Sequence, residues 1–434
     1  MSYDNRERRG GRGRGGRGRG GRGHHSYMNQ GPPQDNPNFE ANWNERVDDF
    51  DSMDLKPELL HGIFSYGFKH PSEIQSLAVR PIMLGRNVIA QAQSGTGKTG
   101  AFSIGILQNI DTSSQTTQAL VLAPTRELAD QIYTFFVEIG ARIPNLQIVI
   151  FKGGVSVQHD QQQAQKLPHI IIATPGRSLS LIQDGYLRCE HLKMVCLDEA
   201  DAMLGEGFVT QVQEIFSFLN PEIQILLFSA TIPVEIFNLM EQFMKDPVKI
   251  LVKAEQLTLE GIRQFYVNVN NDEYKFPTLL DIYGQLSIQK AVIFANKKDT
   301  VDFLQNELSK ANFEVSAIHG GLEQSERERI MQQFRVGNAR VLVATDLIGR
   351  GIDVQQITLV INFEVPPSRE LYLHRIGRSG RYGRKGVAIN ICNMNEMSSI
   401  QNIEEFYRTK IEELPNDFAQ ILKEANDSVD AGEK

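Results

Sequence analysis

Short runs of apolar, largely β-branched residues recur along the chain from about residue 50 onward. Each run has an apolar centre and ends in polar or glycine-rich residues, and longer amphipathic segments such as 127–138 and 208–219 separate the runs. Continuous apolar strands that alternate with helices are typical of a parallel sheet covered by helices on both faces. The runs that predict strands are 87–91, 119–124, 147–151, 169–176, 194–201 and 225–231.

A second series of the same kind follows, and the segment between the two series predicts a connector. We therefore expect an α/β fold with two parallel-sheet domains in tandem, 45–247 and 263–434, joined by a linker at 248–262. In such sheets ligands bind outside the carboxyl ends of the strands, where the polar clusters of this chain lie. The second series comprises 290–296, 314–320, 340–346, 357–366 and 386–392.

Residues 1–44 have a different composition. Residues 10–23 repeat arginine and glycine without an apolar residue, and polar sequence rich in Pro and Asn continues to about residue 44. Such a segment cannot offset the entropy lost on ordering, so we expect a disordered Arg-Gly-rich tail. One interpretation is a weak, sequence-tolerant RNA-binding arm, and the other is a solubilising tail without a specific partner.

Charge is divided unevenly along the chain. Residues 1–23 hold eight arginines against Asp4 and Glu7, a balance of +6, so the total of −8 leaves −14 for the remainder. The three cysteines show no paired metal-ligand spacing, which argues against a zinc site or a disulfide framework. No apolar run reaches the roughly 18 residues of a membrane span, and the N-terminus lacks a signal-peptide core. We expect a soluble intracellular protein.

Residues 92–99, AQSGTGKT, follow a predicted strand and precede an apolar helix around 101–107. The two glycines allow successive backbone N–H groups to face phosphate oxygens, the lysine can neutralise β/γ charge, and the last hydroxyl can bind Mg²⁺. We predict a P-loop for ATP and Mg²⁺, the alternative being a glycine-rich turn without a ligand. Its nucleotide-binding residues are Ser94, Gly95, Thr96, Gly97, Lys98 and Thr99.

Three carboxylates, Asp198, Glu199 and Asp201, follow the apolar run at 194–197. In a P-loop fold a carboxylate at the end of a nearby strand holds the metal, commonly through water, and Asp198 comes first. If the strand pleat continues, Glu199 points the other way, which suits it to orient and deprotonate the attacking water. We expect Asp201 to contact the second domain or residues 229–231. A plain helix N-cap is the alternative interpretation.

ATP hydrolysis also needs positive charge near the γ-phosphate in the transition state. The segment 374–381, HRIGRSGR, offers Arg378 and Arg381, which lie three residues apart and would project from one side of a helix. We predict that both arginines complete the site from the second domain. The alternatives are a solvated basic helix and an RNA-binding patch.

Together these motifs resemble those of the DEAD-box ATP-dependent RNA helicases, whose name is spelled by residues 198–201. The resemblance covers about 47–425 and implies two RecA-like P-loop domains that bind ATP and Mg²⁺ and hydrolyse ATP on RNA. Residues 67–75, GFKHPSEIQ, resemble the adenine-reading segment of the family. It implies that Gln75 bonds adenine and that Phe50, seventeen residues before Gly67, flanks the base.

The resemblance also implies further site residues. Residues 229–231, SAT, match the motif that couples hydrolysis to strand separation, so the coupling set is Ser229, Thr231, Asp201 and His374. In the second domain, 345–353 would place Asp353 on the ATP ribose and Arg350 in the γ-phosphate network. The RNA-binding residues implied by the family motifs are Pro124, Thr125, Arg126, Gly154, Thr174, Pro175, Gly176, Arg177, Gln324, Arg327 and Thr345.

Within the family, residues 257–267 and 374–390 are most similar to the translation initiation factor 4A group, which includes a nuclear relative in the exon-junction complex. This similarity implies a monomeric core that binds RNA without sequence preference. It also implies a translation-initiation scaffold or mRNA-complex proteins as partners, and a cytoplasmic or, alternatively, nuclear location.

Three activities remain open at this point. The first is an RNA helicase that separates short duplexes, and the second is an ATP-dependent RNA clamp whose turnover partners suppress. Both would use the same residues, because they differ in the lifetime of the closed state. A DNA translocase is disfavoured because the RNA preference of the family depends on ribose hydroxyl contacts.

Overall fold

The computed structural model describes residues 40–92, 95–204, 208–252, 262–284, 290–346, 357–379, 386–407 and 409–422. The expected tail at 1–39 lies outside these ranges. So do four of the expected site residues: Ser94, Arg350, Asp353 and Arg381.

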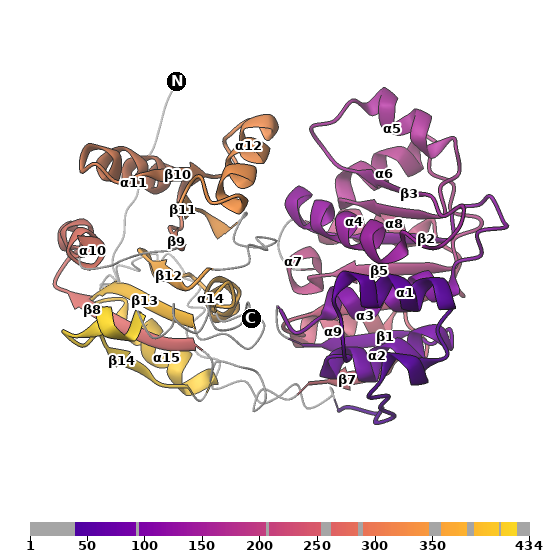
Figure 1. Cartoon of the computed structure of the whole chain (residues 1–434), viewed down its shortest axis with the longest axis horizontal. Helices are drawn as coiled ribbons and strands as arrows, with labels where there is room; N and C mark the ends of the chain where they lie inside the picture. The colour runs from indigo at the N-terminus through magenta and orange to yellow at the C-terminus, as the bar shows by residue number, and fades with distance from the viewer. Residues whose placement is uncertain are drawn as a thin grey trace, which may run out of the picture. The chain divides into compact units, whose positions relative to one another are not determined.

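The first sheet is parallel at every pairing and has the strand order β3-β4-β2-β5-β6-β1-β7 (Figure 1). All six apolar runs predicted in this half form strands, and all of these strands except the half-buried β3 bury most of their side chains on both faces. Only the last strand, β7, was not predicted. The strands are β1 (Val88–Gln91), β2 (Ala119–Leu122), β3 (Ile148–Phe151), β4 (Ile170–Ala173), β5 (Met194–Asp198), β6 (Gln224–Ser229) and β7 (Val248–Leu251).

Helices cover both faces of this sheet, and successive strand residues face opposite cores. Val121, for example, packs in the core under α1–α4, whereas Leu120 and Leu122 pack in the core under α6–α9. The helices are η1 (Phe50–Met53), α1 (Pro57–Tyr66), α2 (Glu73–Met83), α3 (Lys98–Asn109), α4 (Arg126–Gly140), α5 (Val157–Ala164), α6 (Pro175–Gln183), α7 (Ala200–Leu204), α8 (Val209–Ser217) and α9 (Val234–Glu241).

The second sheet repeats the design with the order β10-β11-β9-β12-β13-β8-β14, again parallel at every pairing. The five runs predicted here all form strands, and β8 and β14 add to them. The strands are β8 (Ile262–Val269), β9 (Ala291–Phe294), β10 (Val315–Ile318), β11 (Val341–Ala344), β12 (Leu359–Asn362), β13 (Gly386–Asn393) and β14 (Ile411–Glu413).

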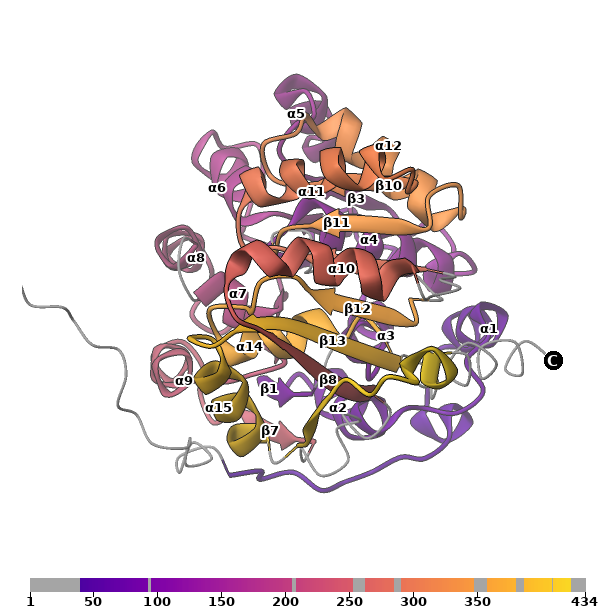
Figure 2. The same ribbon diagram turned by 90° about the vertical axis from the view of Figure 1, so that its left-hand side faces the viewer.

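Figure 2 looks onto this sheet with α10 and α11 in front of its strands. Ala291 and Ile293 of β9 pack on that side, whereas Val292 and Phe294 pack in the core that α12 covers. The α/β class predicted from the apolar runs is therefore confirmed. The helices are η3 (Asp272–Tyr274), α10 (Lys275–Gly284), α11 (Lys298–Lys310), α12 (Gln324–Arg335), α14 (Arg369–Ile376) and α15 (Met397–Tyr407).

Two expected boundaries need correction. The linker expected at 248–262 begins with β7, which pairs with β1 along its whole length, and its last residue opens β8. The expected tail reaches too far, because Asn42 donates its backbone N–H to Lys249 O at 3.1 Å and Trp43 packs against the first core. These polar residues are ordered by backbone pairing at the sheet edge, which an apolar pattern does not report.

Candidate functional site

The two glycines before α3 have the backbone conformation expected of a phosphate-binding loop. Gly95 and Gly97 adopt φ angles of 85° and 100°, a left-handed conformation that a side chain would strain. A Cβ at Gly97 would also lie 2.6 Å from Ser72 Oγ and 2.8 Å from Gln75 Nε2. The loop can therefore turn sharply into the N-terminus of α3, where backbone N–H groups attract anions.

Lys98, the first residue of α3, is buried and donates from Nζ to Ala92 O at 2.8 Å. Burial lowers the pKa of this ammonium, and the nearby carboxylates of Asp198, Glu199 and Asp201 oppose that shift. Among the described residues this acceptor is a neutral carbonyl of its own loop. Phosphate oxygens would be a stronger acceptor for a buried cation than that carbonyl.

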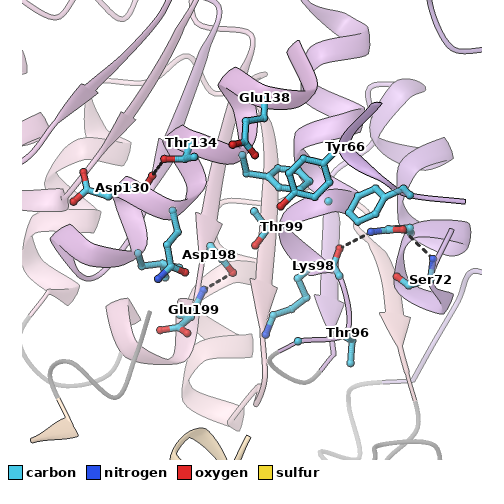
Figure 3. Close-up of a pocket in the computed structure, with 18 of the residues that line it drawn as sticks. Tyr66, Ser72, Thr96, Lys98, Thr99, Asp130, Thr134, Glu138, Asp198 and Glu199 are labelled. Carbon is cyan, nitrogen blue, oxygen red and sulfur yellow. Dashed lines mark hydrogen bonds between the residues drawn. The ribbon is translucent and has the colours of Figure 1, made fainter. Parts of the chain in front are cut away.

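A cavity of about 660 Å³ opens beside this loop (Figure 3). The cavity extends from the phosphate loop to an aromatic wall at one end and to the carboxylates of Asp198 and Glu199 at the end of β5. Its lining comprises Tyr66, Phe68, His70, Ser72, Gln75, Gly95, Thr96, Gly97, Lys98, Thr99, Gly100, Leu128, Asp130, Gln131, Thr134, Phe135, Glu138, Asp198, Glu199, Arg335 and Arg378.

The aromatic wall is made of Tyr66, Phe68 and Phe135, whose ring centroids lie 4.9–5.9 Å apart. Phe50, expected to flank the base, is 1% exposed and stacks against Phe68 at 6.3 Å, and it does not line the cavity. Phe68, which lies within 67–75, lines the cavity, and Phe50 packs against it from the core. The expected contact of Phe50 with the base stays a prediction.

Gln75, expected to read adenine, lies in the cavity wall between the aromatic end and the loop. Its Nε2 donates to Gly97 O at 3.2 Å, and its Oε1 accepts from Ser72 N at 2.9 Å. A Cβ at Gly100 would lie 2.3 Å from Gln75 Nε2, so this side chain packs directly on the start of α3. The amide therefore links the segment 67–75 to the phosphate loop.

Asp198 and Glu199 both line the cavity, which corrects the expectation that they point in opposite directions (Figure 3). The pleat stops at Asp198, because Glu199 has a φ of 51° and begins the turn into α7. Asp198 Oδ1 accepts from Glu199 N at 2.9 Å, and Glu199 Oε2 is buried without a hydrogen-bond partner within the described residues. Positive φ at a non-glycine residue is typical of strained functional positions.

Burial raises the pKa of Asp198 to about 7, and the Lys98 charge opposes the shift. A buried carboxylate of this kind would be stabilised by a cation. Thr99 lies in the same cavity, so a hydroxyl and a carboxylate converge on one place. No group of three or more His, Cys, Asp or Glu side chains forms a metal cluster within the described residues. Mg²⁺ usually needs only one or two carboxylates with water and phosphate oxygens, so these residues fit it.

The four residues of the expected coupling set form one hydrogen-bonded group. Asp201 N donates to Ser229 Oγ at 3.1 Å, and Thr231 Oγ1 donates to Asp201 Oδ2 at 3.0 Å. His374 Nε2 lies 3.0 Å from the same Oδ2. Asp201 thus contacts both the 229–231 segment and the second sheet's helix α14, as the sequence predicted.

Arg378 is buried and lines the cavity, as expected, but it does not lie on a helix. Helix α14 ends at Ile376, and Arg378 follows in a turn where its Nε donates to His374 O at 3.0 Å. Arg378 therefore does not project from α14, and the expected pairing with Arg381 lies outside the described residues.

Arg375 is a residue of this segment that the sequence analysis did not select. It is buried and bonds Asp346 Oδ1 at 2.5 Å, Asp346 Oδ2 at 2.6 Å and Asn296 Oδ1 at 2.6 Å. Its position inside the segment 374–381 could have marked it as a candidate site residue. It ties α14, which precedes Arg378, to the carboxyl ends of β9 and β11.

The RNA-binding residues expected in the first half lie at the carboxyl ends of β2, β3 and β4. Pro124 and Thr125 lead into α4, where Thr125 Oγ1 accepts from Leu128 N at 3.1 Å. Gly154, with a φ of 87°, packs against the guanidinium of Arg126. The remaining four are Thr174, Pro175, Gly176 and Arg177 at the start of α6.

The expected residues of the second half lie on α12 and after β11. Arg126 Nη1 donates to Gln324 Oε1 at 2.8 Å, and Arg327 Nη1 lies 3.6 Å from Glu127 Oε1. Thr345, immediately after β11, is buried, and its Oγ1 has no hydrogen-bond partner among the described residues. The structure thus brings Gln324 and Arg327 to the N-terminus of α4.

Comparisons with known proteins agree with this geometry. The DEAD/DEAH box helicase model matches residues 72–239, and the helicase conserved C-terminal domain model matches 274–383. The chain is 50% identical over 383 residues to a Neurospora crassa ATP-dependent RNA helicase eIF4A, covering 88% of this chain and 96% of that one. It is 50% identical over 397 residues to Drosophila melanogaster eukaryotic initiation factor 4A, covering 90% and 98%.

Solved structures are similar as well. S. cerevisiae Dbp5 bound to RNA and ADP BeF3 matches with a TM-score of 0.82 at 32% identity, covering 88% of this chain and all of that chain. Mss116p bound to ssRNA and AMP-PNP matches with a TM-score of 0.78 at 28% identity, covering 89% and 83%. The chain belongs to the DEAD-box helicase family.

Proposed function

We propose that this chain is an RNA-dependent ATPase that locally unwinds RNA during translation initiation. One cavity holds Lys98, Asp198, Glu199 and Arg378 together, and this observation carries the proposal. The near-complete coverage of initiation-factor helicases at about half identity supports the pathway. A P-loop site with a buried carboxylate pair and an arginine has the parts that phosphoryl transfer needs.

ATP binding follows from the cavity lining. The aromatic wall formed by Tyr66, Phe68 and Phe135 offers ring faces for adenine, with Gln75 at its edge as the hydrogen-bonding group. Lys98 would exchange Ala92 O for phosphate oxygens, and the N–H groups at the start of α3 would face the same phosphates. Asp353 is proposed to hold the ribose from the second domain.

We assign hydrolysis to Glu199 and to the cationic side chains around the phosphates. Glu199 Oε2 is buried and has no hydrogen-bond partner in the part of the chain that the structure describes, so it can orient a water molecule and take its proton. Lys98 and Arg378, with Arg381, would stabilise charge on the transferring phosphoryl group. Thr99 and Asp198 would hold Mg²⁺, with Asp198 acting through water, and the bound ion would neutralise charge on the phosphates.

RNA is proposed to bind along the carboxyl ends of β2, β3 and β4 and on Gln324, Arg327 and Thr345. Contacts to sugar and phosphate dominate such interfaces, so no sequence preference is expected. Asp201 contacts His374, and His374 accepts a hydrogen bond from Arg378 through its backbone oxygen. These contacts would connect the first domain to Arg378.

We propose a monomeric core, a cytoplasmic location and a scaffold protein of translation initiation as partner. No helix within the described residues is long and apolar enough to cross a membrane.

The direct test measures ATP hydrolysis with RNA and with DNA of the same sequence. We expect stimulation by RNA alone, because the family's ribose contacts require the 2′-hydroxyl. Equal stimulation by DNA would contradict the RNA assignment.

A pull-down from cells with a non-hydrolysable ATP analogue tests the role in translation initiation. Recovery of cap-binding scaffold proteins would support that role. Recovery of spliced-mRNA complex subunits would instead favour a nuclear RNA clamp.

Deleting residues 1–34 is expected to leave the ATPase of the core intact and to weaken RNA binding in a salt-dependent way. The deletion spares Asn42 and Trp43, which contact the first domain. Each phosphate neutralised on single-stranded RNA contributes about −0.7 to the log–log salt slope. Full engagement of the eight arginines would change the slope by about 6, and partial engagement by about 2–4.

RNA affinity at several salt concentrations, with and without the segment, decides this prediction. A matched control replaces the eight arginines with lysines, which keeps the charge and should keep most of the slope. Identical slopes for the full and the deleted chain would mean that the segment does not touch RNA, and a solubilising or partner-docking role would replace that interpretation.

A further inference from the structure

Three of the expected RNA-binding segments of the first domain meet at one edge of its sheet. Strands β3, β4 and β2 are neighbours in that order, and each runs into one of these segments. β2 leads to the N-terminus of α4, β4 to the N-terminus of α6, and β3 to the turn at Gly153 and Gly154. The spacing of these three segments therefore depends on the contacts that hold the starts of α4 and α6 and the glycine turn together. One of these contacts involves the neighbouring helix α5.

Arg177, in the first turn of α6, was expected to contact RNA itself. Its side chain is only 10% exposed, and its guanidinium is already engaged by the protein. Nη1 donates to Asp160 Oδ2 of α5, and Nη2 donates to Val155 O at 2.9 Å, directly after the glycine turn. Two of the guanidinium N–H donors are therefore already used on groups of the protein itself.

Asp160 depends on this arginine in turn. Its side chain is 2% exposed, burial raises its pKa, and the Arg177 charge opposes that shift. The other titratable group nearby is His159, whose Nδ1 lies 3.6 Å from Asp160 Oδ1. Removing one partner of a buried ion pair leaves the other charge uncompensated, so Asp160 and Arg177 are held as a unit.

The glycine turn is thereby fixed on two sides. On one side Arg177 bonds Val155 O. On the other side the Arg126 guanidinium packs so closely that a Cβ at Gly153 or Gly154 would lie 2.8 or 2.9 Å from it. Arg126 belongs to the first turn of α4, so all three segments are connected through one turn of backbone.

We propose that Asp160 and Arg177 are positioning residues that hold the glycine turn and the start of α6 in the spacing that RNA requires. Arg177 acts through the backbone that it fixes, and Asp160 acts through Arg177. The RNA contacts of this surface come from backbone N–H groups and from Arg126. The inference rests on the proposed RNA-binding function and adds Asp160 to it.

The test is Asp160→Asn in the full-length chain. Removing a negative charge near an RNA surface should strengthen binding if electrostatics alone decides. The proposal predicts the opposite, RNA affinity weaker by about tenfold, because the charged partner of Arg177 is lost. The salt slope, the KM for ATP and kcat at saturating RNA should stay at wild-type values. Asp184→Asn removes the same charge from an exposed site at the end of α6 and should not weaken RNA binding.

Arg177→Gln and the double variant complete a cycle. Each single variant and the double variant break the same Asp160–Arg177 ion pair. The proposal therefore predicts that all three weaken RNA binding by about the same factor and leave the salt slope unchanged. Direct phosphate contact by Arg177 would instead reduce the slope by about 0.7 in Arg177→Gln and raise affinity in Asp160→Asn, and that result would overturn the proposal. The double variant leaves no buried unpaired charge, so its RNA affinity can test the proposal if Asp160→Asn does not fold. A wild-type chain that fails to bind RNA would reject the proposed function instead.

Discussion

Replacing Glu199 by glutamine is expected to lower RNA-stimulated ATP turnover by about 10²–10⁴-fold while ATP and RNA still bind. Glutamine keeps the shape of the side chain in its buried place beside Asp198, but it cannot accept the proton of the attacking water. Glu199 Oε2 has no hydrogen-bond partner within the described residues, so no structural bond of that oxygen is lost. Single-turnover hydrolysis and equilibrium binding of ATP and RNA measure the two parts of this prediction.

The same variant should accumulate the ATP-bound, RNA-bound form, because binding proceeds and hydrolysis does not. Dissociation of labelled RNA in ATP should therefore become slower than in the wild type. Glu190→Gln, at an exposed position before β5, is the matched control and should behave as wild type. Wild-type turnover in Glu199→Gln would assign the base to another residue.

Most strands were predictable because their signal is local. In a parallel sheet covered on both faces, a strand such as Ile170–Ala173 buries every side chain, so a continuous apolar run reports it directly. β7 gives a weaker signal, because its burial alternates and Lys249 interrupts the apolar run. Asn42 gives none, because its backbone and its side-chain amide pair with Lys249 at the sheet edge.

The chemical residues of the site were predictable in identity more than in orientation. Lys98, Thr99, Asp198 and Glu199 line one cavity because the carboxyl ends of β1 and β5, which flank β6, lie at the same edge of the sheet. The direction of Glu199 was wrong, because its left-handed φ breaks the pleat from which that direction was inferred.

The orientation of a side chain also cannot be predicted when its ion-pair partner is distant in sequence. Arg177 faces Asp160 on another helix, and Arg375 faces Asp346 after another strand. Nothing within a short motif reports such partners. Both arginines form ion pairs, Arg375 fully buried and Arg177 largely so, although each belongs to a motif that is otherwise associated with ligand contact.

Replacing Arg378 by alanine is expected to lower RNA-stimulated hydrolysis by about 10³–10⁵-fold and to change ATP affinity far less. Arg378 lines the same cavity as Lys98 and Glu199 but is carried by the segment after α14, next to His374 and its bond to Asp201. Its charge would meet the phosphates chiefly in the reacting state, so its loss should appear in kcat rather than in binding. Single-turnover rates with saturating RNA, and titration of an ATP analogue, separate the two quantities.

Two further variants make this prediction specific. Arg378→Lys keeps the charge without the planar fork and should recover only part of the rate, because the fork fixes the direction of the hydrogen bonds. Arg340→Ala removes one positive charge from an exposed position before β11 and should leave turnover unchanged. If Arg378→Ala instead lost ATP affinity and hydrolysed bound ATP at the normal rate, the arginine would be a binding residue. Hydrolysis would then not depend on the segment that links Arg378 to Asp201.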